Sequence, residues 1–300
     1  MAVSINCARK TGELVITIGY KFFLVEKVGA CGVPATAKVA RAALHFGEEP
    51  CISGTRGSGT VFFAGCPLHC RFCQNHSISQ EGFGQVITPR RLADIFKELE
   101  ADGAHNINLV SATQFVPVLL QAVELYRPAI PLVYNSGGYE RVETLRALEG
   151  IIDVYLPDLK YVDNALAAAL SGVPDYFEHA SAAILEMAQQ TGPMQLDEEG
   201  IAQKGTMVRH LVLPGQTRSS LQVLDWLAEN LPKGSFVSLL FQYTPVREVE
   251  GFPALSRRLT RREREKVFDY LLERGLTEGY AQEAGSASAA FIPAFDLTGV

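Results

Sequence analysis

Three cysteines in one short loop constrain this chain more than any other feature. Cys66, Cys70 and Cys73 follow one another with the spacing C-x3-C-x2-C, directly after a run of β-branched and aromatic residues at 60–64. Such a run is typical of a β-strand. Three thiols that follow it within eight residues can converge on one point, and a cluster of thiolates needs a soft metal to hold it together. The segment therefore predicts a short strand followed by a metal-binding loop.

The number of cysteines separates two kinds of metal site. A closed zinc site needs four ligands, and this loop offers only His69 and His76 as a fourth. An iron–sulfur cubane held by three cysteines keeps one iron open for chemistry. The spacing favours the cluster, and a zinc-binding structural or interaction protein is the alternative hypothesis.

The cysteine loop, with Phe72 just before its last cysteine, resembles the cluster loop of the radical S-adenosylmethionine (SAM) enzymes. Three further stretches, at 54–60, 103–109 and 133–139, look like the subgroup related to the pyruvate formate-lyase activating enzyme. The resemblance covers about residues 28–300.

The resemblance implies both cofactors and chemistry. Cys66, Cys70 and Cys73 would hold a [4Fe-4S] cluster, and the amino and carboxylate groups of SAM would bind the fourth iron. One electron would cleave SAM to methionine and a 5′-deoxyadenosyl radical, which abstracts a hydrogen atom. No side chain is then needed as a catalyst beyond the cluster and SAM. The expected partners are a glycyl-radical enzyme or other protein substrate, or else a small molecule, and a flavodoxin- or ferredoxin-type electron donor.

Composition excludes some functions. The net charge of the 300-residue chain is −6, and its longest basic runs are the pairs at 257–258 and 261–262, which argues against a nucleic-acid partner. No apolar run reaches membrane-spanning length. One stretch resembles an export signal, but Lys21 interrupts its apolar run, and Glu26 and Lys27 precede the would-be cleavage site. We therefore expect a cytoplasmic protein, in which these cysteines bind metal rather than form disulfides.

An alternation of strand and helix patterns predicts the fold class. Apolar runs predict six strands, at 60–64, 106–111, 131–134, 151–156, 207–213 and 236–241. Helical patterns fall at 89–101, 116–125, 139–148, 164–171, 175–190, 219–230 and 260–274, and the stretch 34–45 fits either a helix or a strand. Repeated β-then-α units predict an α/β fold, a parallel sheet wrapped by helices. Six units fit the partial (β/α)6 barrel that the resemblance also implies, with an N-terminal extension at 1–53 and a barrel at 54–300 that includes a docked C-terminal tail.

Polar residues follow the expected strands, where the loops of such barrels carry the chemistry. They could contact SAM, although a helix cap, a tight turn and a surface ion pair are the structural alternatives. The resemblance adds Phe72 as a cofactor contact, and Arg209 is expected to face the barrel interior; His210 is expected to be structural. The complete set of expected SAM contacts is Phe72, Ser111, Thr113, Asn135, Ser136, Gly137, Asp158, Lys160 and Arg209.

Two further groups of residues precede the cysteine loop. Gly54, Gly57 and Gly59 do not form a phosphate loop, because no Gly-Lys-Ser/Thr follows them, and we expect them to let the backbone pass close to the cluster or cofactor. Cys7, Cys31 and Cys51 could bind an accessory metal, but the paired spacing of a metal knuckle is missing, which favours free buried thiols.

Overall fold

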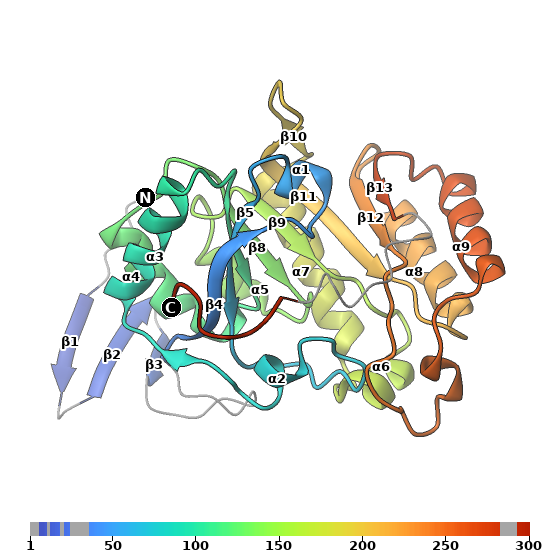
Figure 1. The fold of residues 1–300 in the computed structure, drawn as a ribbon, viewed down its shortest axis with the longest axis horizontal. Helices are drawn as coiled ribbons and strands as arrows, with labels where there is room; N and C mark the ends of the chain where they lie inside the picture. The colour runs from blue at the N-terminus through green and yellow to red at the C-terminus, as the bar shows by residue number, and fades with distance from the viewer. Residues whose placement is uncertain (1–5, 11–12, 19–20, 25–35, 283–292) are drawn as a thin grey trace.

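A mostly parallel sheet forms the centre of the molecule (Figure 1). The computed structural model describes residues 6–10, 13–18, 21–24, 36–282 and 293–300. The strands of the sheet are ordered β13-β12-β11-β9-β8-β7-β5-β4-β6, and β10 pairs with β11 outside this path. Pairing is parallel from β5 through to β13, whereas β4 and β6 are antiparallel. The fold is therefore the expected α/β class with an open, partial barrel.

The strands of this sheet have the following bounds: β4 Lys38–His45, β5 Ser58–Phe63, β6 Gln85–Val86, β7 Ile107–Val110, β8 Leu132–Ser136, β9 Val154–Pro157, β10 Gln195–Leu196, β11 Ala202–Leu211, β12 Phe236–Leu240 and β13 Gly279–Ala281. All six expected strands are present, and the ambiguous stretch at 34–45 contains a strand. A separate antiparallel sheet consists of β1 Asn6–Lys10, β2 Glu13–Ile18 and β3 Lys21–Leu24.

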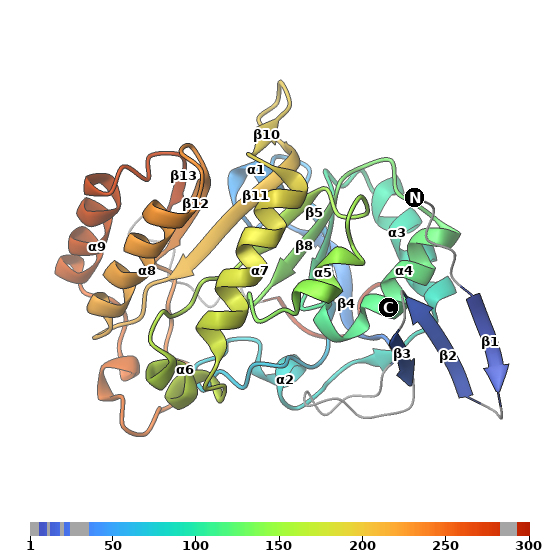
Figure 2. The same cartoon turned by 180° about the vertical axis from the view of Figure 1, so that it is seen from behind.

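Helices cover one face of the sheet (Figure 2). They are α3 Pro89–Ala101, α4 Val116–Leu125, α5 Val142–Arg146, α6 Asn164–Ser171, α7 Tyr176–Thr191, α8 Thr217–Asn230 and α9 Arg261–Glu273. Two short helices, α1 Pro50–Ser53 and α2 His76–Ser79, lie in loops. The prediction for 139–148 was too long, because the chain turns at Gly138 (φ +80°) and Arg141 is still extended.

Side chains alternate between the helix-covered face and the opposite face, which we call the inner face. Val61, Phe63 and Tyr134 are buried in the core that includes residues of α3 and α4. Several of the intervening positions on neighbouring strands are polar and meet in register: Thr60 lies opposite Asn108, and Arg209 lies opposite Ser238. Helix α1 packs on the inner face, where Cys51 and Ile52 contact buried residues of β8, β9 and β11. Cys51 is a buried free thiol.

The described part of the C-terminal tail docks on β4, as expected from its apolar sequence (Figure 1). Leu297 N–H donates to Ala40 O (3.1 Å), and Ala42 N–H donates to Thr298 O (2.8 Å). The ring of Phe295 lies 5.4 Å from that of Phe62 in an edge-to-face contact. Within the described residues, no helix is both long and apolar enough to cross a membrane.

The prediction for Gly54, Gly57 and Gly59 was wrong. These glycines lie at or before the start of β5, whereas the cysteine loop follows its end. They are needed for packing instead: a Cβ on Gly59 would lie 3.0 Å from Leu99, Ala104 and the backbone of Asn106.

We predict that Gly138→Ala destabilises the protein more than Gly150→Ala does. Both glycines have a positive φ, +80° and +74°, which costs an alanine about 1–2 kcal/mol. A Cβ on Gly138 would also lie 2.1 Å from Asp158 O, while nothing lies within 4 Å of one on Gly150. Urea unfolding should give a loss of about 1–2 kcal/mol for Gly150→Ala and on the order of 3 kcal/mol or more for Gly138→Ala. Equal losses would show that the contact with Asp158 relaxes at no cost.

Candidate functional site

The cysteine loop leaves the C-terminal end of β5 and is fixed by the end of α6. His69 N–H donates to Ser171 O (3.0 Å), and Arg71 N–H donates to Leu170 O (2.8 Å). Cys70 is buried, and its Sγ lies 3.1 Å from Ser171 Oγ. On the other side of the loop, Ser79 Oγ donates to Cys73 Sγ (3.3 Å). Hydroxyl groups thus contact two of the three sulfur atoms, from opposite sides of the loop.

The donor set of this loop fits an iron–sulfur cluster. Burial raises the pKa of the Cys66 thiol, and the neighbouring Cys70 and Cys73 raise it further. Three thiolates this close to one another need cationic metal to be stable. Among the described residues no three His, Cys, Asp or Glu side chains gather tightly enough to hold a single metal ion. A cubane takes each cysteine on a different iron.

The loops after β7 and β8 lie against the cysteine loop. Gln114 Nε2 donates to Gly65 O (2.9 Å) and lies 3.2 Å from Ala64 O, which ties the loop after β7 to the residues just before Cys66. Ser111, one of the expected SAM contacts, has a φ of +61°, a strained conformation for a residue other than glycine. A Cβ on Gly137 would lie 2.8 Å from Leu68 Cδ1. A side chain at this position would require the buried Leu68 side chain to move, so glycine favours this close approach of the residue after β8 to the cysteine loop.

Tyr176, at the start of α7, connects the loops after β8 and β9. Its hydroxyl accepts a hydrogen bond from Lys160 N–H (2.9 Å) and lies 2.9 Å from both Gly137 O and Asp158 O. The side chain is fully buried. The sequence analysis missed this residue, because nothing in a tyrosine at a helix start shows that its hydroxyl reaches two loops.

Asp158 and Lys160 follow β9 and form an ion pair. Burial lowers the pKa of Lys160, but the adjacent Asp158 and the nearby Cys70 outweigh it, so that the pKa lies well above its usual value. Lys160 is therefore a cation held beside the cysteine loop. Phe72 is also buried here, with its ring 6.3 Å from that of Tyr243.

Thr113 and the buried Glu140 form a second pair, which joins the loops after β7 and β8. Thr113 Oγ1 donates to Glu140 Oε1 (2.6 Å), so the threonine hydroxyl is already engaged. Glu140 is 2% exposed, and its Oε2 has no hydrogen-bond partner among the residues that the structure describes. Burial raises the pKa of Glu140 to about 7.

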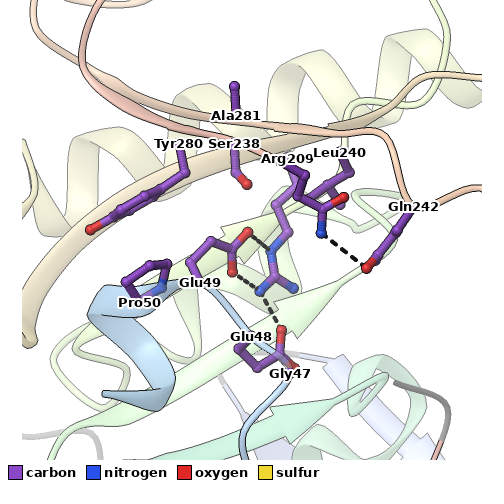
Figure 3. Close-up of a pocket in the computed structure, with 11 residues that line it drawn as sticks. Gly47, Glu48, Glu49, Pro50, Arg209, Ser238, Leu240, Gln242, Tyr280 and Ala281 are labelled. Atoms are coloured by element: carbon purple, nitrogen blue, oxygen red, sulfur yellow. Dashed lines mark hydrogen bonds and ion pairs between the residues drawn. The ribbon is translucent and has the colours of Figure 1, made fainter. Parts of the chain in front are cut away.

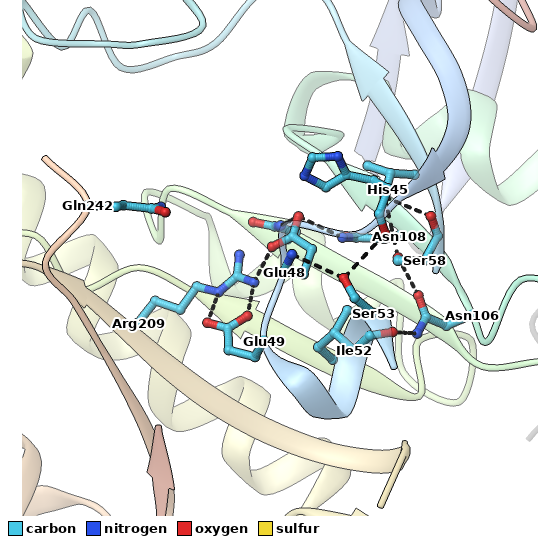
Figure 4. A network of polar contacts seen from close by, with 12 residues as sticks. His45, Glu48, Glu49, Ile52, Ser53, Ser58, Asn106, Asn108, Arg209 and Gln242 are labelled. Atoms are coloured by element: carbon cyan, nitrogen blue, oxygen red, sulfur yellow. Dashed lines mark hydrogen bonds and ion pairs between the residues drawn. The ribbon is translucent and has the colours of Figure 1, made fainter. Parts of the chain in front are cut away.

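Arg209 faces the inner side of the barrel, as expected, but its charge is already paired (Figures 3 and 4). Its guanidinium contacts both carboxylates of Glu48 and Glu49, with 2.5 Å to Glu48 Oε2 and 2.9 Å between Nε and Glu49 Oε1. The sequence analysis missed both glutamates, although two acids in a row before a proline in an apolar stretch were a visible signal. His210 is structural, as expected: its Nδ1 lies 2.7 Å from Leu159 O and its Nε2 2.9 Å from Ser220 Oγ.

The structure thus brings several of the expected residues together at one edge of the sheet. Gly137 lies close to Leu68 of the cysteine loop. Lys160 pairs with Asp158 and lies near Cys70. Asn135 and Ser136 end β8, and Asn135 Nδ2 lies 3.5 Å from Glu48 Oε1, while Ser136 Oγ accepts from Gly138 N–H.

Comparison with known proteins identifies the class. The family model of the radical SAM superfamily matches residues 60–227, more than half of the chain. The chain belongs to the radical SAM superfamily. Members of this superfamily use a [4Fe-4S] cluster and SAM, and the zinc-binding alternative gives way to this finding.

Two kinds of relative accompany this match. The uncharacterized protein MJ0674 of Methanocaldococcus jannaschii is 33% identical over 236 residues, which are 75% of this chain and 64% of that protein. The chain thus spans slightly less than two thirds of this relative. Among solved structures, Streptococcus suis SuiB bound to its precursor peptide SuiA has a TM-score of 0.51 at 15% identity, over 75% of this chain and 48% of SuiB. Spore photoproduct lyase has a TM-score of 0.49 at 13% identity, over 77% of this chain and 78% of the lyase. The likeness to SuiB shows the shared fold.

We predict that Glu140 makes the protein less stable as the pH rises. The pKa of the carboxyl is raised from 4.5 to about 7 on folding, so its contribution is fully present below pH 4.5 and is lost as the pH rises through 7. Between pH 4.5 and 8, Glu140 should lower the unfolding free energy of the wild-type protein by up to about 3 kcal/mol. This loss should be absent in Glu140→Gln. The measurement is the difference in unfolding free energy between wild type and variant, obtained by urea unfolding across this pH range. The contributions of His210 and other titrating groups are the same in both proteins and cancel in this difference. A difference that does not change with pH would refute the assignment.

Proposed function

We propose that this protein reductively cleaves SAM and uses the resulting 5′-deoxyadenosyl radical to abstract a hydrogen atom from a protein or peptide substrate. The observation that carries the proposal is the joint position of the three-cysteine loop, Gly137 and the Asp158–Lys160 pair at the C-terminal edge of the sheet. Cys66, Cys70 and Cys73 would hold the cluster, which supplies the electron.

The residues around the loop have distinct roles in this proposal. Lys160 would neutralise the carboxylate of SAM, and Asp158 would hold the lysine in place through their ion pair. Gly137 would leave room for the methionine end, since a side chain there meets Leu68. Phe72 would offer an apolar surface to the adenine. Hydrogen-bonding groups at the same edge complete the set of proposed SAM contacts: Ser111, Thr113, Asn135 and Ser136.

Two of these roles need refinement. Thr113 donates its hydroxyl to Glu140, so it would act by holding the loop after β7, with its oxygen as the remaining acceptor. Arg209 is engaged by two carboxylates, so it would act from the inner face of the barrel and not as a free anion-binding group.

The substrate class is a separate step of the proposal. SuiB, which shares the fold, was crystallised with a precursor peptide. Similarity of the stretches at 54–60, 103–109 and 133–139 to the group of the pyruvate formate-lyase activating enzyme favours a glycyl-radical enzyme as the substrate. A flavodoxin- or ferredoxin-type protein would supply the electron, in the cytoplasm. We retain residues 1–53 as an extension and 54–300 as the catalytic barrel. Anaerobic incubation with a candidate glycyl-radical enzyme, SAM and reductant, followed by electron paramagnetic resonance, tests this step by the appearance of a protein radical.

We predict that Cys66→Ala, Cys70→Ala and Cys73→Ala each abolish cluster assembly and SAM cleavage. Each substitution leaves an iron without its protein ligand. Wild-type protein reconstituted anaerobically with iron and sulfide should show broad visible absorbance that dithionite bleaches, and should form 5′-deoxyadenosine. Cys51→Ala is the matched control, because Cys51 is a buried residue of α1 outside the cysteine loop and its loss should leave both signals intact. If all three loop variants still formed 5′-deoxyadenosine, the ligand assignment would be wrong.

We predict that Lys160→Met weakens SAM binding by about tenfold, equivalent to about 1.4 kcal/mol. The substitution keeps the aliphatic part of the side chain but removes the charge beside the cysteine loop. Equilibrium dialysis of labelled SAM against the reconstituted protein measures the affinity. Lys97→Met, which removes an exposed lysine paired with Asp94 on α3, is the control. Unchanged affinity in Lys160→Met would exclude the lysine from the SAM site.

A further inference from the structure

A cavity of about 250 Å³ lies on the inner face of the barrel, between α1 and the ends of β11, β12 and β13 (Figure 3). One wall is charged and consists of Glu48, Glu49 and Arg209; the other is largely apolar and includes Pro50, Leu240 and Tyr280. The volume is below the range of drug-sized ligands and suits a single side chain or a small metabolite.

The cavity shares its walls with the proposed SAM site. Gln242 lines the cavity, and its backbone carbonyl oxygen accepts a hydrogen bond from Nε2 of Gln74, the residue after Cys73 (3.5 Å). Arg209 forms a parallel bridge with Asp158, and Leu159 N–H donates to Arg209 O (2.8 Å). A group bound in the cavity would therefore lie next to the cysteine loop and the Asp158–Lys160 pair.

The charges at the cavity do not balance. Arg209 is the cation of the lining and faces two carboxylates, of which Glu49 is ionised: burial opposes its charge, but Arg209 outweighs burial and lowers the pKa. Neighbouring cations that the structure describes are paired elsewhere, Lys160 with Asp158 and Arg41 with Asp296. His45, beside Glu48, has a pKa lowered chiefly by burial, so it is largely neutral at pH 7. One negative charge in excess remains in a mostly buried wall, which is costly unless a cation joins it.

A second observation points to a missing ligand. Ser238 lines the cavity and is 1% exposed, and its hydroxyl has no partner at full hydrogen-bond distance among the described residues, although it lies close enough to Glu49 to help lower the pKa of that carboxyl. Buried hydroxyl groups are nearly always hydrogen-bonded. Asn108, whose Nδ2 donates to Glu48 Oε1 (3.2 Å, Figure 4), likewise has a buried Oδ1 without a partner.

We propose that this cavity binds an aliphatic primary ammonium group of the substrate, with Glu48 as the specificity-determining residue. Glu48 supplies the excess charge, and its side chain, 13% exposed, is more accessible than that of Glu49 at 5%. The apolar wall would hold the carbon chain, and the Tyr280 ring would lie beside it. This inference rests on the proposed function, because it names the substrate of the same site.

The test is binding of a matched pair of ligands by isothermal titration calorimetry, with the anaerobically reconstituted protein in the presence of SAM. Nα-acetyl-lysine methylamide and Nα-acetyl-norleucine methylamide differ by the amino group at the end of the chain. We expect the lysine compound to bind at least tenfold more tightly, and Glu48→Gln to remove this preference. n-Pentylamine identifies the source of the amine: binding as tight as that of the lysine compound indicates a free amine, and weaker binding indicates a residue within a peptide.

Controls separate recognition from folding and from the proposed function. Glu98→Gln removes a carboxylate paired with Arg91 on the surface and should retain the preference. Thermal unfolding checks that Glu48→Gln is folded; if it is not, the preference of the wild-type protein alone decides. Equal binding of the two amides, or an unchanged preference in folded Glu48→Gln, would overturn the inference. Cluster absorbance and SAM cleavage are followed in the same preparations, so their loss would instead count against the proposed function.

Discussion

The parallel hydrogen-bond ladder from β5 to β12 determines where every functional group of this protein lies. Parallel strands all end at the same edge, so loops that are far apart in the sequence must meet there. The cysteine loop follows β5, Asn135 and Ser136 end β8, and Asp158 and Lys160 follow β9. Pairing of β11 with β9 then brings Arg209 beside Asp158. The chemistry of the site is thus a consequence of strand direction.

The ladder alone does not fix the loops; buried polar groups do. Tyr176 joins the loops after β8 and β9 through one hydroxyl, and Gln114 joins the loop after β7 to the residues preceding Cys66. Ser171 contacts both Cys70 and Tyr161. Tyr176 and Ser171 are fully buried, so losing a partner there would cost more than the hydrogen bond itself contributes. Such contacts hold loops in place for a cofactor that needs ligands at fixed positions.

Local signals explain what could be predicted from the sequence. The helices at 89–101, 116–125 and 164–171 were predicted to the residue, because Thr88 with Pro89, or a clear helical period, marks their bounds. The three cysteines and the residues after the strands were found because spacing and strand order are visible in the sequence. The ion pairs of Arg209 with Glu48 and Glu49 were not found, because they join residues about 160 positions apart. The role of Gly54, Gly57 and Gly59 was misjudged for a similar reason, since only the folded chain shows which end of β5 they occupy.

The two edges of the sheet are protected in different ways. β13 has three residues, which leaves little backbone for another strand to pair with. β4 has eight residues and would offer a long row of unpaired amides, but β6 pairs with Lys38 and Val39, and the C-terminal tail bonds to Ala40 and Ala42. The tail therefore does more than pack its apolar side chains. By occupying this edge it prevents a second molecule from extending the sheet, which guards an open barrel against edge-to-edge aggregation.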